Sequence, residues 1–135
     1  MKVKISMDNI LWLVVVLVLV FYILYSKGII MANFESVSVK AAQHMIKKDK
    51  NVTVLDVRTA EEVRDDGKIA KAKHIPLNEL SQNLSSLNKS KKVLVYCRSG
   101  SRSVSASRML EKNGFTPLNL SGGINAWKAE KLPVK

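Results

Sequence analysis

Residues 91 to 110, KKVLVYCRSGSRSVSASRML, decide the fold because they read as a strand, a loop and a helix in immediate succession. The run KKVLVYC, rich in valine and ending at Cys97, predicts a buried strand. Small and apolar residues then recur at helical spacing, which predicts a helix from Arg102 to Asn113 that ends at Gly114. The loop between them holds the single cysteine of the chain.

The same alternation continues on both sides of this stretch. Further strands are predicted at NVTVLDV (51–57) and PLNL (117–120), and helices at residues 38–49 and 121–130. The stretch HIPL (74–77) reads as a brief extended piece, and Asn78 as the N-cap of a helix over 79–87. Strands that alternate with helices predict an α/β domain with a mainly parallel central sheet.

The N-terminal region has a different composition. Residues 10 to 25, ILWLVVVLVLVFYILY, contain no charge and would span about 24 Å as a helix. We predict one transmembrane helix within a membrane anchor at 1–26, a linker at 27–36 and the globular domain at 37–135. A cleaved signal peptide is the alternative, but SKGIIMANFES, which follows the run, offers no small-x-small cleavage pattern.

The near flanks of this segment carry equal positive charge, Lys2 and Lys4 against Lys27 and Lys40, so the positive-inside rule gives no orientation. We favour the cytoplasmic side for the globular domain, because a single reactive thiol stays reduced more easily there.

The chain is basic, with 22 Lys and Arg against 11 Asp and Glu and a net charge of +11. Such a balance favours anionic partners, or reflects a solvated lysine-rich surface. The basic residues are scattered and no aromatic residues interleave with them, which argues against nucleic-acid binding. A single cysteine excludes an internal disulfide and the paired-cysteine spacing of a structural zinc site.

The loop after Cys97 has the features of an anion-binding turn. In a parallel sheet, ligands bind beyond the carboxyl ends of the strands, where Cys97 is expected. Backbone N–H groups of the loop, the N-terminus of the following helix, and Arg98 and Arg102 all favour a thiolate and an anionic substrate. Gly100 permits backbone geometry closed to other residues. The alternative is a buried structural cysteine, which would need neither the glycine nor the two arginines.

Four motifs give the chain a resemblance to a known family. Residues 97–103, CRSGSRS, resemble the C-x-x-G-x-R-S active loop of single-domain rhodaneses, which are sulfurtransferases. Residues 54–58 (VLDVR) resemble the aspartate-x-arginine signature of the family. GKI at 67–69 with HIPL at 74–77, and LSGGINAW at 120–127 with LPV at 132–134, are similar to its remaining motifs. The matches run in order from about residue 36 to residue 135.

The resemblance implies a rhodanese-like three-layer fold and transfer of sulfane sulfur through a Cys97 persulfide. The donor would be thiosulfate or another persulfide, and the acceptor cyanide, a thiol or a protein cysteine. Cys97 would be the nucleophile. Asp56 and Arg58 would support the loop, and no metal or organic cofactor is implied. The substrate-binding residues would be Arg98, Ser99, Gly100, Ser101, Arg102 and Ser103, with the two arginines holding the anionic end of the donor.

Two other functions compete with this prediction. The domain could be a membrane-tethered sulfur carrier or a protein-binding module that turns over thiosulfate poorly and takes sulfur from a protein persulfide. It could also be a phosphatase, which likewise uses a thiolate, a loop of backbone amides and an arginine. However, the tyrosine-phosphatase loop has five residues between cysteine and arginine, and four separate Cys97 from Arg102 here. The shorter loop suits sulfur better than a phosphate ester.

Overall fold

A five-stranded, fully parallel sheet with strand order β1-β5-β4-β2-β3 forms the centre of the domain. The structure is a computed structural model that describes residues 4–135. The strands are β1 (Glu35–Val37), β2 (Val52–Asp56), β3 (Lys73–His74), β4 (Lys92–Tyr96) and β5 (Thr116–Leu120). The three longest strands were all expected from their apolar runs. By contrast, β1 begins inside the stretch predicted as a linker, because its first two residues are exposed and leave no apolar signal.

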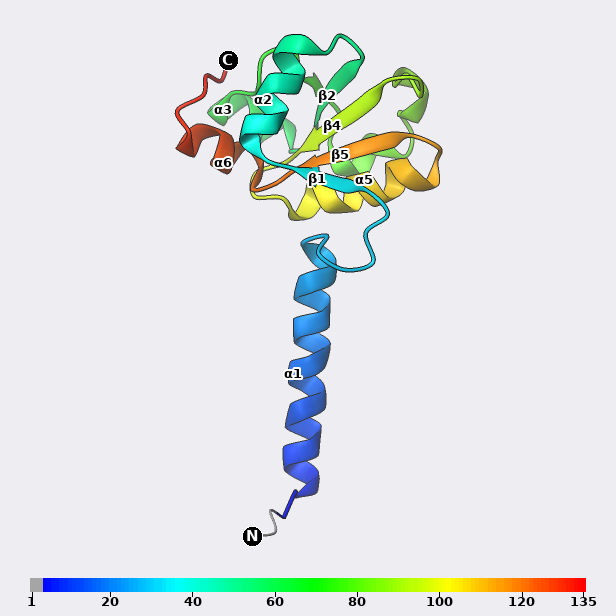
Figure 1. Ribbon diagram of the computed structural model, residues 1–135, viewed down its shortest axis with the longest axis vertical. Coiled ribbons are helices and arrows are strands. Elements are labelled where there is room, and N and C mark those ends of the chain that lie inside the picture. Colours follow the sequence, from blue (N-terminus) through cyan, green and yellow to red (C-terminus); the bar gives the residue numbers. More distant parts are fainter. Residues whose placement is uncertain (1–3) are drawn as a thin grey trace.

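Helices cover both faces of the sheet (Figure 1), which confirms the predicted α/β architecture. Alternate residues of β4 point to opposite faces. The helices are α2 (Val39–Lys48), α3 (Ala60–Asp66), α4 (Leu77–Leu80), α5 (Ser101–Lys112) and α6 (Gly123–Ala129). Leu94 and Tyr96 pack in a core with residues of α2 and α6, and Val93, Val95 and Cys97 pack in a second core with residues of α4 and α5.

The single helix predicted over 79–87 is wrong. The chain forms α4, which starts after Pro76 rather than Asn78, and then a separate 3-10 turn, η1 (Leu84–Ser86). Polar side chains in the intervening segment bind the backbone themselves: the Asn83 amide donates to the Glu79 carbonyl at 2.7 Å and the Ser86 hydroxyl to the Asn83 carbonyl at 2.7 Å. Such bonds compete with a regular helix.

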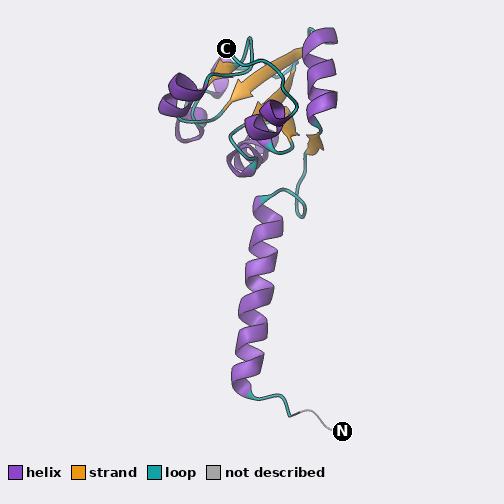
Figure 2. Ribbon diagram, turned by 90° about the vertical axis from the view of Figure 1, so that its left-hand side faces the viewer, coloured by secondary structure: helices purple, strands orange, loops and turns teal. Residues whose placement is uncertain are grey.

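Helix α1 (Met7–Ser26) projects away from the domain as an isolated rod (Figures 1 and 2). None of its residues is buried, although nearly all of them are apolar. Its length and composition fit a membrane-crossing helix, and a signal sequence near the N-terminus would pass the same test. Its last turn contacts α5, where the Arg108 guanidinium lies 3.7 Å from the centre of the Tyr25 ring and donates to the Ile30 carbonyl at 3.1 Å.

Candidate active site

Cys97 follows β4 directly and lies at the start of the loop that leads into α5. Its side chain belongs to the core on the α5 face of the sheet, and the residue is 1% exposed. The Gly100 backbone N–H donates to Sγ at 3.1 Å, and the thiol lies 3.5 Å from the Ser103 hydroxyl. The Ser103 hydroxyl in turn donates to the Gly100 carbonyl at 3.0 Å. The loop therefore closes around the sulfur.

The loop conformation depends on Gly100, which has φ 117° and forms the N-cap of α5. An L side chain rarely adopts this backbone conformation. Helix α5 begins at Ser101, one residue before the predicted start, and no side chain caps it. The N–H groups of its first turn, on Ser101, Arg102 and Ser103, therefore have no acceptor within the helix. Together with the helix dipole they suit an anion held beside Cys97.

The start of α6 holds the cysteine loop from the other side. The Cys97 carbonyl accepts from the Ile124 N–H at 2.9 Å, and the Arg98 carbonyl from the Asn125 N–H at 3.1 Å. A Cβ on Gly123 would lie 2.5 Å from the Cys97 carbonyl oxygen, so this close approach requires glycine. The sequence predicted a glycine turn before a helix here, but it gave no sign that this turn touches the cysteine loop.

The two arginines of the loop have different surroundings. Arg102 forms a two-pronged ion pair with Glu62 of α3, with one N–O distance of 2.8 Å. Hydrogen bonding to Arg102 outweighs partial burial and lowers the pKa of Glu62 to about 2. The same bond raises the pKa of Arg102. Arg98 is exposed and makes no ion pair within the described residues 4–135.

Glu62 is a residue of the site that the sequence analysis did not single out. The Thr59-x-x-Glu62 spacing is visible as a capping box, and the structure contains that box at the start of α3. Its partner Arg102 lies 40 residues away in the chain, so the pairing depends on the tertiary fold.

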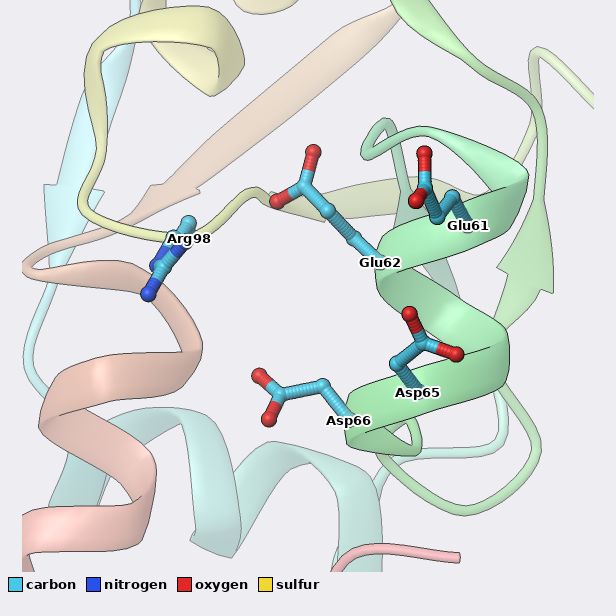
Figure 3. Close-up of a pocket in the computed structure, with 5 residues that line it drawn as sticks. All are labelled: Glu61, Glu62, Asp65, Asp66 and Arg98. Carbon is cyan, nitrogen blue, oxygen red and sulfur yellow. The ribbon is translucent and has the colours of Figure 1, made fainter.

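A pocket of about 270 Å³ separates the cysteine loop from α3. Arg98 lines it on the side of the loop, and Glu61, Glu62, Asp65 and Asp66 line it on the side of α3 (Figure 3). Asp66 also forms an ion pair with Lys128 of α6 at 2.9 Å, and this hydrogen bond lowers the pKa of Asp66. The pocket is therefore acidic, although the chain as a whole is basic.

Asp56 and Arg58 form a fully buried ion pair, with 2.7 Å between the Arg58 guanidinium and the Asp56 carboxylate. The guanidinium also donates to the Gly67 carbonyl at 2.6 Å and lies 5.7 Å from the centre of the Tyr96 ring. The Tyr96 hydroxyl accepts from the Ile69 N–H at 3.0 Å. Burial is the largest cause that raises the pKa of Tyr96, and the nearby Asp56 carboxylate raises it further. The pair thus packs against the residue that precedes Cys97, and no hydrogen bond joins it to the loop itself within residues 4–135.

These features define an α/β domain with a cysteine in a glycine-centred loop at the carboxyl end of a parallel strand. The rhodanese-like domain model matches residues 38–130, and the chain belongs to the rhodanese-like family. It is 34% identical to the putative sulfurtransferase YtwF of Bacillus subtilis, over 75% of this chain and 97% of that protein. It is 32% identical to the thiosulfate sulfurtransferase GlpE of Coxiella burnetii, over 71% of this chain and 89% of that protein.

The fold is also similar to the crystal structure of a rhodanese-related protein from Thermoplasma volcanium. The TM-score is 0.70 at 34% identity, and the match covers 76% of this chain and 98% of that one. The family match begins at residue 38, so most of the quarter of the chain that is not covered is the N-terminal region that contains α1. The relatives support a rhodanese-type sulfurtransferase.

Proposed function

We propose that this protein is a membrane-anchored sulfurtransferase that carries sulfane sulfur as a persulfide on Cys97. The observation that supports this most directly is the position of the Cys97 sulfur: 3.1 Å from the Gly100 N–H and next to the uncapped first turn of α5. Such surroundings stabilise both a thiolate and a persulfide anion. Because relatives of the chain are named sulfurtransferases, sulfane sulfur is the group that we expect it to transfer.

The transfer takes two displacement steps. The Cys97 thiolate attacks the outer sulfur of thiosulfate, the S–S bond breaks, and sulfite leaves with the bonding electron pair. Cyanide or a thiolate then attacks the terminal sulfur of the Cys97 persulfide. This forms thiocyanate or a new persulfide and regenerates the Cys97 thiolate. The N–H groups of residues 98–103 stabilise the anions at both steps.

Arg98 and Arg102 would hold the anionic end of the donor. Arg98 is the better placed of the two, because it lines the pocket and makes no ion pair within residues 4–135. Arg102 is held by Glu62, so its contribution would come from its charge and its backbone N–H. Asp56 and Arg58 would act indirectly by keeping the end of β4 in place.

The exposed apolar helix α1 would cross a membrane, with the domain on the cytoplasmic side. A helix of 20 residues is about 30 Å long, which matches the hydrocarbon core of a bilayer. Exposing this much contiguous apolar surface to water would be unfavourable, and a lipid environment removes that cost.

A sulfur carrier that is loaded by a protein persulfide is the second candidate, and the acidic pocket favours it. Glu62, Asp65 and Asp66 form ion pairs, whereas Glu61 forms none within residues 4–135. This carboxylate-rich lining would attract a partner with basic residues around its persulfide more strongly than a free dianion such as thiosulfate.

The test uses the full chain purified in detergent. After incubation with thiosulfate, intact mass under non-reducing conditions should show the gain of one sulfur atom, and cyanide should remove it as thiocyanate. Cys97→Ser should show neither. If thiosulfate fails but a protein persulfide donor loads Cys97, the carrier function is supported; if neither loads it, the sulfurtransferase proposal is wrong.

A further inference from the structure

A second pocket of about 270 Å³ lies against the cysteine loop and shares no lining residue with the acidic pocket. It is bounded by the turn that follows α1, by the loop itself and by the carboxyl end of β5. The residues relevant here are Lys27, Ile29, Ser99, Gly100, Asn119 and Ser121. Ligands of parallel α/β sheets bind at this end of the strands.

Asn119 is the first sign that the pocket takes a ligand. It is 3% exposed, and its side-chain N–H donates to the Ser36 hydroxyl at 3.3 Å. Its carbonyl oxygen Oδ1 is buried and has no hydrogen-bond partner within the described chain. Buried acceptors of this kind are normally satisfied. A ligand with a hydroxyl or amine group would supply the missing donor.

Lys27 gives the pocket a positive charge. Its ammonium group makes no ion pair in the described part of the chain, and no carboxylate is among the described residues that line the pocket. The hydroxyls of Ser99 and Ser121 add further donors. The ligand therefore combines an anionic group, bound by Lys27 and the serines, with a donor for Asn119.

The position of the pocket indicates where such a ligand comes from. Lys27 follows α1 directly, and the next turn carries the exposed apolar residues Ile29 and Met31. Arg108 holds this turn on α5 through Tyr25 and Ile30. If α1 crosses a bilayer, as proposed above, the pocket lies at the depth of the lipid headgroups.

We propose that this pocket binds the headgroup of an anionic phospholipid that carries a hydroxyl group, such as phosphoglycerol. The phosphate contacts Lys27 and the serine hydroxyls, and the glycerol hydroxyl donates to Asn119 Oδ1. This inference rests on the proposed membrane span but not on the sulfur chemistry. Because Ser99 and Gly100 belong to the cysteine loop, a bound headgroup also connects the membrane surface to the site of the persulfide.

The test is native mass spectrometry of the full chain in detergent with phosphatidylglycerol or phosphatidylcholine at equal concentration. The chain should retain phosphatidylglycerol preferentially. Lys27→Gln should weaken that binding about fivefold, since a lysine at an anionic surface contributes about 1 kcal/mol. Asn119→Asp, which is isosteric and replaces the neutral acceptor with a charge that repels phosphate, should weaken it at least as much. Lys4→Gln is the matched control, because it removes the same charge near the opposite end of α1.

Equal binding by the Lys27 and Lys4 variants, or no preference over phosphatidylcholine, would overturn the proposal. Binding of glycerol 3-phosphate without retention of the lipid would assign the pocket to a soluble phosphate ester and overturn the lipid assignment. Two further measurements on the same variants test the other proposals separately. Persulfide formation tests the sulfur chemistry, and carbonate extraction from membranes tests the membrane span.

Discussion

The two sides of the cysteine loop present different charged groups. On the α3 side, four carboxylates and Arg98 line the pocket, and three of the carboxylates form ion pairs. The side next to the end of α1 presents Lys27 and no carboxylate within the described lining. The net charge of +11 predicts neither surface. Local placement of charge, rather than the sum over the chain, therefore decides which molecules each side can accept.

The two sides also differ in how firmly they are held. Buried or half-buried ion pairs, Asp56–Arg58 and Glu62–Arg102, tie α3 and the end of β2 to the sheet and to the cysteine loop. The turn that follows α1 is held on α5 by Arg108, through one ring contact at 3.7 Å and one hydrogen bond. We expect substitutions to affect the stability of the first side more strongly.

The largest effect is expected from Arg58→Ala. It leaves the Asp56 carboxylate buried without its partner, which should lower the free energy of unfolding by about 3–5 kcal/mol. Arg108→Ala is the matched variant on the other side and should cost about 1–2 kcal/mol, since its contacts are partly exposed. Urea unfolding of the domain, followed by the fluorescence of the buried Trp127, measures both. Equal decreases in the free energy of unfolding for the two variants would show that the two sides are held equally firmly.

An intermediate effect is expected from Glu62→Gln, and it depends on pH. The pKa of Glu62 is lowered from an ordinary 4.5 to about 2, so its ionised form stabilises the fold above pH 4.5, and this contribution disappears as the pH falls toward 2. Because Arg102 is 35% exposed, we expect the free energy of unfolding of the wild-type protein to exceed that of the variant by only about 1–2 kcal/mol at neutral pH.

Unfolding measured from pH 7 to pH 2 tests this expectation, and the two proteins should converge at the acid end. A difference that stays constant with pH would mean that the Glu62 charge is not what stabilises the pairing. Glu111→Gln, at the far end of α5, is the control for loss of a partly exposed carboxylate.

The smallest effect is expected from Glu61→Gln, which removes one carboxylate from the acidic pocket without breaking an ion pair seen in residues 4–135. Lower repulsion should reduce the KM for thiosulfate about twofold at low salt, and the gain should vanish at high ionic strength. Steady-state thiocyanate assays measure this, again with Glu111→Gln as the control. A higher KM would show that the carboxylate assists the donor.

The sequence predicted Cys97 at a strand end, the glycine-centred loop and the helix after it, because these depend on neighbouring residues. It also predicted the α/β class from the alternation of elements. The sequence did not predict β1, because its three residues carry too little apolar signal. It predicted one helix where α4 and η1 form, because the apolar spacing does not show the side-chain hydrogen bonds of Asn83 and Ser86 that interrupt the helix. The roles assigned to Arg98, Arg102, Asp56 and Arg58 stay predictions.

Other features of the site could be seen only in three dimensions. Glu62 reaches Arg102 across 40 residues, and Gly123 must lack a side chain because it touches the Cys97 carbonyl. Asn119, whose side-chain oxygen has no hydrogen-bond partner within residues 4–135, lines the same pocket as Lys27, which lies 92 positions earlier in the chain. The sequence by itself determined the cysteine loop and the apolar helix, since both follow from local composition and spacing. The tertiary structure alone decided the charges around that loop. Parallel pairing of β2 and β4 brings Glu62 and Arg98 to the same carboxyl end of the sheet, and the contacts of Arg108 with Tyr25 and Ile30 place the turn that carries Lys27 on the other side.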